Sequence, residues 1–240
     1  MRLLLTRPLA EAQASIARLR HMGHTAIAAP VIEIVPLAGA LRDGAWQGVV
    51  LTSAHATAGL TPAQLDRLAT LPTFAVGRRS AEAARASGFE RVHAADGDET
   101  ALARLVVTHL PAGSTVLYLA GRERRGALAG QLWAAGYGCQ IVETYDAVGS
   151  VAFAPDVLTQ LRDAQIDAVL HYSARSAAIF VTLAGVAGLG AEIAGLHHLC
   201  LSPAVAAQLA TIAPTRIRIA ARPDEATLFA LLEPDRLQGD

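Results

Sequence analysis

The second half of the chain repeats short segments of the first half in the same order. Residues 3–7 match 116–122, Gly23 matches Gly136, 49–54 match 169–174, 74–77 match 199–202, and 98–102 match 224–228. A repeat this long predicts two similar lobes rather than a solenoid of short units. Two lobes also predict a cleft between them, because domain interfaces are favoured positions for ligand sites.

The composition is that of a folded protein with no general attraction to polyanions. Of the 240 residues, 52% are hydrophobic and 17% are charged, and the formal net charge is −1. This length fits one large or two small domains. Because the net charge is close to zero, neither nucleic acid nor an anionic membrane is expected as a partner. An anionic ligand would have to be held by local groups.

The cysteines, histidines and apolar runs point to a cytoplasmic protein without a metal. Cys139 and Cys200 lie in apolar, strand-like runs and lack a C-x-x-C spacing, so we expect buried thiols in a reducing compartment. No histidine lies in an H-E-x-x-H pattern. The apolar run 3–5 is too short for a secretory signal. Residues 176–191 are too few and too rich in glycine to span a bilayer.

Short apolar runs alternate with helical stretches rich in Ala, Leu and Arg. The expected strands are 2–6, 25–29, 48–52, 73–77, 91–94, 115–119, 139–144, 167–172, 198–202 and 216–220. The expected helices are 9–21, 54–60, 62–70, 79–87, 99–110, 122–135, 155–164, 174–185, 203–211 and 224–233. Near-continuous apolar strands alternating with helices predict an α/β fold with doubly wound parallel sheets.

The lobe boundaries are expected within the repeats rather than between them. Pro111–Ser114, at the repeat junction, has the sequence of a tight turn between a helix and a strand. Looser, proline-bracketed segments lie at 35–40 and 148–152. We therefore expect one lobe at 38–146 and a discontinuous lobe made of 1–35 and 150–240.

Several of these motifs together resemble the uroporphyrinogen-III synthase family. The matching pieces span the chain: Leu5–Pro8, Leu51–Ser53, Ala75–Gly77 with Ser80–Ala81, Tyr118–Arg122, Glu143–Tyr145, Tyr172–Ala174, Ala221–Pro223 and Thr227–Leu228. Their order and spacing carry the resemblance, since each piece alone is weak. Two positions depart from the family pattern: Ser80 stands where threonine is common, and Asp224 follows Pro223 where threonine or serine is common.

The resemblance implies a fold and an activity. The family fold is two flavodoxin-like lobes joined by a two-segment linker, with the first lobe discontinuous and the substrate cleft between the lobes. The implied activity is that of a cofactor-free lyase that cyclises linear hydroxymethylbilane to uroporphyrinogen III in haem biosynthesis. It expels water and inverts the last pyrrole ring. The implied protein is a cytoplasmic monomer that can receive this small molecule directly from the preceding enzyme of the pathway.

Tyr145 is the expected catalytic residue. It is expected at the end of an apolar strand, just before a crossing between lobes. A phenol is a proton donor at neutral pH and could help the substrate hydroxyl to leave. Packing at a domain edge is the alternative for this tyrosine.

The expected substrate-binding residues lie where strands meet helices. They are Arg7, Pro8, Thr52, Ser53, Gly77, Ser80, Arg122, Ser173, Arg175 and Thr227. Ligands bind at the carboxyl ends of strands in open α/β sheets, and helix N-termini attract carboxylates. Arginine binds a carboxylate with two hydrogen bonds. The alternatives are N-caps for the serines and solvated surface charge for the arginines.

Two functions without catalysis compete with this reading. One is a two-lobed protein that binds small anions, for which a signal peptide would be expected. The other is a regulatory pair of receiver-like lobes. A receiver needs acidic residues at its first strand ends and a lysine, but the first strand here ends in Thr6-Arg7 and the chain has no lysine. The phosphate-loop and dinucleotide fingerprints are also absent.

Overall fold

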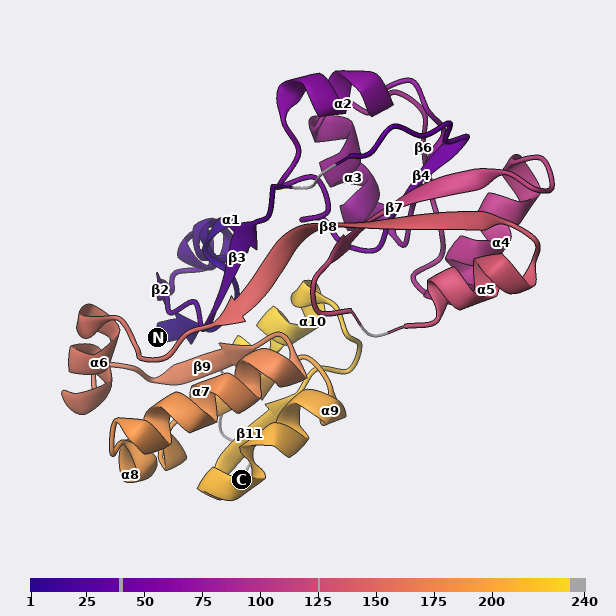
Figure 1. Ribbon diagram of the computed structural model, residues 1–240. Helices are drawn as coiled ribbons and strands as arrows, with labels where there is room; N and C mark the ends of the chain where they lie inside the picture. Colours follow the sequence, from indigo (N-terminus) through magenta and orange to yellow (C-terminus); the bar gives the residue numbers. More distant parts are fainter. Residues whose placement is uncertain (39–40, 125, 234–240) are drawn as a thin grey trace. The chain divides into compact units, whose positions relative to one another are not determined.

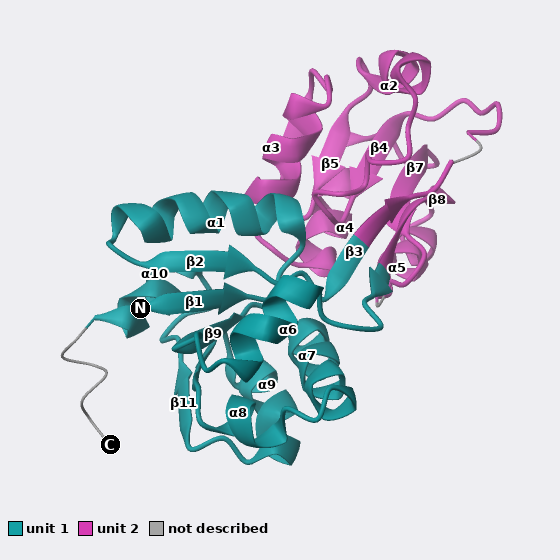
Figure 2. Cartoon of the chain, turned by 90° about the vertical axis from the view of Figure 1, so that its left-hand side faces the viewer, with its two compact units in different colours: residues 1–33, 148–240 teal, residues 34–147 magenta. Residues whose placement is uncertain are grey.

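The chain forms two compact units. The computed structural model describes residues 1–38, 41–124 and 126–233. Unit 1 combines Met1–Glu33 with the chain from Val148 onward, and unit 2 is Ile34–Ala147 (Figure 2). The chain therefore leaves unit 1 once and returns to it once.

Unit 1 is built on a five-stranded sheet with the order β11-β10-β9-β1-β2 (Figure 1). Its strands are β1 (Arg2–Leu5), β2 (Thr25–Ala28), β9 (Ala168–His171), β10 (His197–Cys200) and β11 (Arg216–Ile219). All neighbouring strands pair in parallel. Their carboxyl ends therefore meet at one edge of the sheet.

Helices cover both faces of the unit 1 sheet. One core cluster joins Leu3, Leu5 and Leu170 to residues of α1 (Leu9–His21) and α10 (Glu225–Phe229). Another joins Cys200 of β10 to α7 (Ala174–Val186), α9 (Pro203–Ala206) and the 3-10 helix η1 (Ala207–Ile212). Alternate residues of a strand point to opposite faces, so Leu199 and Cys200 of β10 belong to different clusters. The remaining helical elements are α6 (Pro155–Arg162), α8 (Gly190–Ala194) and the 3-10 helix η2 (Ala230–Leu232).

Unit 2 is built on a six-stranded sheet with the order β3-β8-β7-β4-β5-β6. Its strands are β3 (Ile32–Pro36), β4 (Gly48–Leu51), β5 (Thr73–Ala75), β6 (Val92–Ala94), β7 (Thr115–Gly121) and β8 (Gly138–Gly149). The five strands from β4 to β8 pair in parallel. On one face pack α4 (Glu99–His109) and α5 (Leu128–Ala134), and on the other pack α2 (Pro62–Leu68) and α3 (Arg78–Ala86).

The two sequence repeats exchange their halves between the two units. In the first repeat, β1 and β2 lie in unit 1, whereas β4, β5 and β6 lie in unit 2. The corresponding strands of the second repeat are β7 and β8 in unit 2, and β9, β10 and β11 in unit 1. Unit 1 thus takes two strands from the first repeat and three from the second, and unit 2 takes three from the first and two from the second. When these strands are numbered by their place in a repeat, both sheets have the flavodoxin-like order 2-1-3-4-5, and β3 is added at one edge of the unit 2 sheet. The expected α/β fold class is confirmed.

Short sequence signals explain the ends of several helices. The Thr61 hydroxyl accepts from the backbone N–H of Gln64, and the Gln64 side chain accepts from the Thr61 N–H, which forms a capping box at the start of α2. Asp98 caps the start of α4, and its repeat partner Asp224 caps the start of α10 in the same way. Gly23 and Gly136 have φ of 81° and 82°, a left-handed conformation that suits glycine after a helix.

Some expected elements are wrong or have different bounds. The expected helix 54–60 is instead a series of turns. The segments expected to be loose contain the ends of two strands, because β3 reaches Pro36 and β8 reaches Gly149. Of the expected helix 122–135, only α5 is helical. Residues 39–40 and 125 lie outside the described residues, so the expectations for those positions are not addressed.

The turns at 54–60 result from close contacts with two other segments of unit 2. The Thr144 hydroxyl donates to the Ala56 carbonyl over 2.6 Å, which takes the acceptor that a helix would offer to residue 60. The N–H of Leu60 instead bonds to the Thr57 carbonyl. A Cβ on Gly59 would lie 1.9 Å from the Leu37 carbonyl oxygen. Tertiary contacts thus override the local helix propensity of this alanine-rich segment.

Both cysteines are free thiols in strands. Cys139 lies in β8 and Cys200 in β10. Burial raises the pKa of Cys139 to about 11 and that of Cys200 to about 12. These thiols therefore stay protonated at neutral pH and pack as small apolar side chains.

Candidate functional site

The carboxyl-terminal edge of the unit 2 sheet gathers several of the expected site residues. Thr52 and Ser53 follow β4, Gly77 follows β5, and Arg122 follows β7. Tyr145 lies inside β8 rather than at its end, which corrects the sequence expectation. It is nevertheless at this edge, because its register partner is Gly121, the last residue of β7.

The Tyr145 ring lies directly over Gly121. A Cβ on Gly121 would be 2.8 Å from Cζ and 2.9 Å from the hydroxyl oxygen of Tyr145. A residue with a Cβ at position 121 would clash with the ring, so only glycine allows Tyr145 to pack here. The imidazole of His55 meets the Tyr145 ring edge-on, with centroids 5.9 Å apart. Tyr145 as a whole is partly exposed.

Thr52 is paired with a second tyrosine. Its Oγ1 lies 2.8 Å from the hydroxyl of Tyr118, which comes from the neighbouring strand β7. The Tyr118 side chain is buried, with 3% of its surface exposed. Burial raises the pKa of Tyr118, so this group remains a neutral phenol.

Two arginines, Arg122 and Arg124, pair with two carboxylates near Tyr145 in the sequence and the sheet. Arg122 approaches Glu143 and donates to Asp146 over 3.1 Å. Arg124 donates to Glu143 over 2.9 Å and to the carbonyl of Gly121 over 3.1 Å. The hydrogen bond from Arg124, followed by the charge of Arg124 and the bond from Arg122, lowers the pKa of Glu143. A substrate carboxylate would therefore compete with these side chains for the arginines.

Gly77 begins α3 without a side chain that caps it. The residue has an extended backbone and makes no capping hydrogen bond. A Cβ at Gly77 would meet only the Cα of Gly97, at 3.9 Å, so space is open here. Ser80 lies in the first turn of α3 and is buried. Arg78 is exposed and approaches Glu82 of the same helix.

Ser53 and Ser173 differ although they are repeat partners. Ser173 is an N-cap, and its hydroxyl oxygen accepts from the Ser176 N–H over 3.0 Å at the start of α7. Ser53 accepts from the N–H of His55 over 3.1 Å, but no helix follows it. Ser53 therefore closes a turn, and its expected N-cap alternative is wrong. Arg175 is the second residue of α7.

Arg7 of unit 1 is held by neighbours within the same unit. It follows β1, and its Nη1 donates to Glu225 over 2.7 Å and to Ser15 over 2.9 Å. Its guanidinium carbon lies 4.1 Å from the centre of the Tyr172 ring, a cation–π contact. Burial, and then the Glu225 carboxylate, raise the pKa of Tyr172. Pro8, the next residue, is the N-cap of α1.

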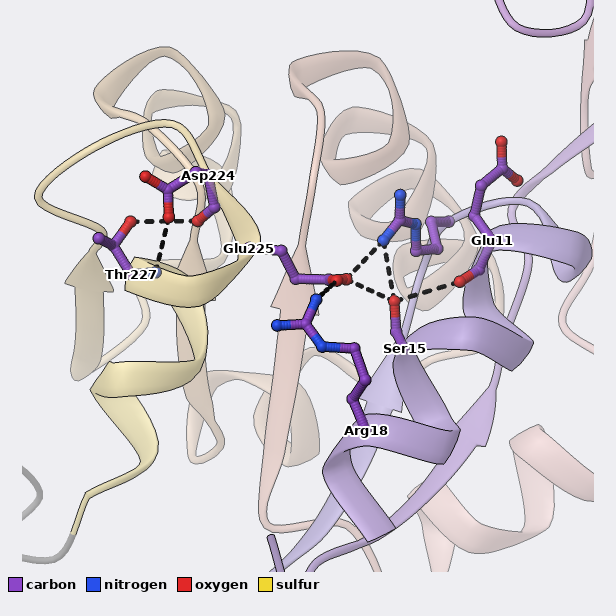
Figure 3. Close-up of polar contacts among 7 residues, drawn as sticks. Glu11, Ser15, Arg18, Asp224, Glu225 and Thr227 are labelled. Atoms are coloured by element: carbon purple, nitrogen blue, oxygen red, sulfur yellow. Dashed lines mark hydrogen bonds and ion pairs between the residues drawn. The ribbon is translucent and has the colours of Figure 1, made fainter. Parts of the chain in front are cut away.

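Glu225 is the centre of this cluster. Figure 3 shows its carboxylate pointing from α10 toward Ser15 and Arg18 of α1. Oε1 accepts from Arg7 and Ser15, and Oε2 accepts from Arg18. Asp224, the residue after Pro223 that departs from the family pattern, caps α10 with its side chain. Its bond from the Thr227 N–H is the main cause of its lowered pKa.

Thr227 makes local hydrogen bonds at the start of α10. Its hydroxyl donates to the Arg222 carbonyl over 2.7 Å and approaches the Asp224 carbonyl oxygen at 3.1 Å. Its own N–H donates to the Asp224 carboxylate over 2.8 Å. The hydroxyl proton is therefore used within the chain in this structure, and its oxygen is the group that could still accept a hydrogen bond.

A smaller and a larger cavity are lined by described residues of unit 2. The smaller, of about 60 Å³, is lined by Tyr118, Glu99, Arg124, Gly126, Leu128, Ala129 and Ile141. The larger, of about 550 Å³, is lined by Ala38, Arg42, Asp43, Gln140, Ile141, Val142 and Glu143. Arg124 of the smaller cavity and Glu143 of the larger form the ion pair described above.

Comparison with known proteins identifies the family. The family model for uroporphyrinogen-III synthase HemD matches residues 13–230. The chain belongs to this family. Proteins with curated functions gave no match.

Solved structures of uroporphyrinogen-III synthases have a similar fold. The enzyme from Helicobacter pylori has a TM-score of 0.68 at 14% identity, over 97% of this chain and 98% of that one. A mutant enzyme from the extremely thermophilic bacterium Thermus thermophilus has a TM-score of 0.50 at 16% identity, over the whole of both chains. At these identities the structural likeness concerns the fold alone.

Membership of the uroporphyrinogen-III synthase family makes the chain an enzyme of the lyase class in haem biosynthesis. No helix in the described part of the chain is long and apolar enough to cross a membrane. Among the same residues, no three His, Cys, Asp or Glu side chains are grouped as metal ligands.

Two residues at the unit 2 edge of this synthase were not predicted from the sequence. Tyr118 belongs to the motif Tyr118–Arg122 that carried the family resemblance, but it was not placed in the site. The signal was its position three residues before the end of β7, opposite Val50 in register, with a side chain long enough to reach Thr52. Arg124 was not among the expected site residues, and its bonds to Gly121 and Glu143 depend on folding that its local sequence does not specify.

Proposed function

We propose that this chain cyclises hydroxymethylbilane to uroporphyrinogen III, with inversion of the last pyrrole ring and loss of water. The observation that supports this most is the position of Tyr145. Its phenol is seated on Gly121 at the carboxyl-terminal edge of a parallel sheet, and its backbone carbonyl accepts from the N–H of Arg122. The Thr52–Tyr118 pair lies at the same edge. Ligands of open α/β sheets bind at this edge.

The reaction needs one proton transfer and much conformational control. The hydroxymethyl group must leave as water, and the substituted carbon of the last ring must then reach the electrophilic carbon before the free end does. We assign Tyr145 as the general acid for the leaving hydroxyl. The larger part of the acceleration comes from holding a flexible chain of four rings in one conformation.

The substrate carries eight carboxylates, and we propose binding groups for them in each unit. In unit 2 these are Thr52, Ser53, Gly77, Ser80 and Arg122. In unit 1 they are Arg7, Pro8, Ser173, Arg175 and Thr227. The uncapped start of α3 at Gly77 is suited to a carboxylate, because its first N–H groups carry the positive end of the helix dipole. Arg7 is proposed for its place after β1, because its Nη1 already donates to Glu225 and Ser15.

We further propose that the enzyme acts without a cofactor, as a monomer in the cytoplasm. The reaction involves no net oxidation or reduction, so acid catalysis and orientation are sufficient. Hydroxymethylbilane closes spontaneously in water, and direct hand-over from the preceding enzyme would limit this loss.

Analysis of the porphyrin isomers tests the proposal. Purified full-length protein is incubated with hydroxymethylbilane in the presence of a chelator, and the oxidised products are separated by chromatography. We expect the type III isomer with the protein and the type I isomer without it. Production of the type I isomer alone, or a strict need for an added metal, would contradict the proposal.

A further inference from the structure

The pair of hydroxyls at Tyr118 and Thr52 has the geometry of a positioning device. The 2.8 Å bond joins adjacent parallel strands, and it runs from inside the core to the strand end. The Tyr118 ring is packed in the core cluster beneath α4 and α5, together with Val50 and Phe74. Thr52 is only partly buried. One partner is thus fixed by packing, and the other lies where a ligand would bind.

We infer that Tyr118 is a positioning residue that orients the Thr52 hydroxyl toward a carboxylate of the substrate. This rests on the proposed function and extends it to a residue behind the binding surface. A phenol is the stronger donor of the two hydroxyls, and an aliphatic hydroxyl is the better acceptor. With Tyr118 donating, the Thr52 proton points away from the core and is free for an anionic acceptor.

The Tyr118 phenol keeps its proton at neutral pH and can donate it. Burial, the largest influence, raises the pKa of Tyr118, and the nearby Glu99 carboxylate acts in the same sense. The hydrogen bond with Thr52 and the charge of Arg124 lower the pKa but are outweighed. Because a buried phenol proton needs an acceptor, the Thr52 oxygen at 2.8 Å satisfies it.

Tyr137 provides a matched control in the same core cluster. It is also buried, with 5% of its surface exposed, and its hydroxyl donates to the Leu110 carbonyl over 2.9 Å. Tyr118→Phe and Tyr137→Phe therefore each delete one buried hydroxyl from the same cluster. Both variants should lose some stability, but only the first should alter substrate binding.

The test measures KM and kcat for formation of the type III isomer by the full-length protein. Tyr118→Phe is expected to raise KM about 3- to 10-fold, the effect of one lost hydrogen bond, while kcat changes little. Tyr137→Phe should keep the wild-type KM. Thr52→Ser should also keep it, because the hydroxyl is retained. In a Thr52→Val background, Tyr118→Phe should have no additional effect on KM, because the two hydroxyls act as one unit.

Several outcomes would overturn the inference. A wild-type KM for Tyr118→Phe would contradict the inference. Additive effects of Tyr118→Phe and Thr52→Val on KM would also contradict it. If Tyr118→Phe fails to fold at the temperature of the assay, Tyr118 is a core scaffold rather than a positioning residue. If the wild-type protein makes only the type I isomer, the proposed function fails first, which is a separate result.

Discussion

At the scale of single residues, most of the polar groups at the strand ends already have partners in this structure. Arg7 bonds to Glu225, Arg122 to Asp146, and Thr227 to the Arg222 carbonyl. These bonds hold the side chains in defined positions before any ligand arrives. Fixed geometry reduces the entropy lost on binding, so such a site can orient a flexible substrate.

Replacing Tyr145 by phenylalanine should slow the reaction and leave the fold intact. The substitution removes the hydroxyl but keeps the ring over Gly121 and its edge contact with His55. We expect kcat to fall by about 10-fold, less than the hundredfold typical of general acids, because the hydroxyl of this substrate can leave unaided. The measurement is the initial rate of type III formation at several pH values, with thermal melts as the control. A full rate across this range would make Tyr145 a packing residue only.

A buried pair of histidines predicts that unit 1 loses stability in mild acid. His171 and His198 are fully buried, and Nε2 of the first lies 3.0 Å from Nδ1 of the second. Nε2 of His198 lies 2.8 Å from the Ile193 carbonyl, which can only accept, so it carries a proton. Nδ1 of His198 then accepts from His171, and both rings are neutral.

Burial lowers the pKa of both histidines below 6.5, the value expected for the unfolded chain. Their contribution to the free energy of unfolding is therefore fully present above pH 6.5. As the pH falls below this value, the unfolded chain binds protons that the folded chain does not bind, so the folded state loses stability. The slope is at most about 1.4 kcal/mol per pH unit for each histidine. Urea unfolding at pH 7.5 and 5.5 measures this effect.

The controls for this pH effect are His171→Gln and His93→Gln. The first removes one buried titrating group and should reduce the loss of stability in acid. His93 also has a lowered pKa, caused mainly by burial, but it is only partly buried and should contribute less. An equal unfolding free energy of the wild-type protein at the two pH values would contradict the prediction.

At the scale of secondary structure elements, Glu225 of α10 accepts a hydrogen bond from Arg18 of α1, which lies more than 200 residues earlier in the sequence. Arg18 of α1 also stacks on the Phe229 ring of α10, with its guanidinium carbon 5.0 Å from the ring centre. The helix α10 spans only Glu225–Phe229 and is too short to be stable alone. Its position therefore depends on these contacts and on the core residues beneath it.

Glu225→Gln should destabilise the protein by about 2 kcal/mol, because it removes a charged acceptor of several hydrogen bonds in a mostly buried cluster. The side chains of Arg7 and Glu225 are only 15% and 23% exposed, so water compensates little. The control is Glu82→Gln, which breaks the exposed pair of Glu82 with Arg78 and should cost less than about 0.5 kcal/mol. Chemical denaturation measures both. Equal, small effects would show that the cluster does not stabilise α10.

At the scale of the whole molecule, the exchange of repeat halves predicts which fragment can fold. A fragment of residues 36–150 contains all the strands from β4 to β8, whereas a fragment of residues 1–113 ends before β7. In the second fragment β4 lacks its partner β7, and β1 lacks its partner β9. Exposed apolar strand faces and edges favour aggregation rather than folding.

We therefore propose that residues 38–146 form a lobe that folds independently, and that residues 1–35 and 150–240 form the other. The fragment 36–150 should give a cooperative thermal melt and the circular dichroism of an α/β protein. The fragment 1–113 should give neither. The reverse result would contradict this division of the chain.

The sequence by itself determined the α/β class, the duplication and the family. These depend on properties that repeat locally: apolar runs such as Leu3–Leu5, helix caps such as Asp98, and glycines after helices such as Gly23. The same local signals explain why α1 was expected within its observed bounds of Leu9–His21. Local rules could not reveal β3, because Ile32–Pro36 follows Pro30 closely, ends in a proline and is a strand only through its neighbour β8.

Only the tertiary structure decided which strands are neighbours in each sheet and which side chains meet. A repeat pattern is the same whether β1 pairs with β4 or with β9, and the register of the folded sheet selects β9. Residues 54–60 favour a helix locally, but the bond from Thr144 and the close approach at Gly59 impose turns. Tyr118 reaches Thr52, and Tyr145 rests on Gly121, because pairing between strands brings together residues far apart in sequence. Side-chain contacts across strands are set by long-range packing, which local sequence does not encode.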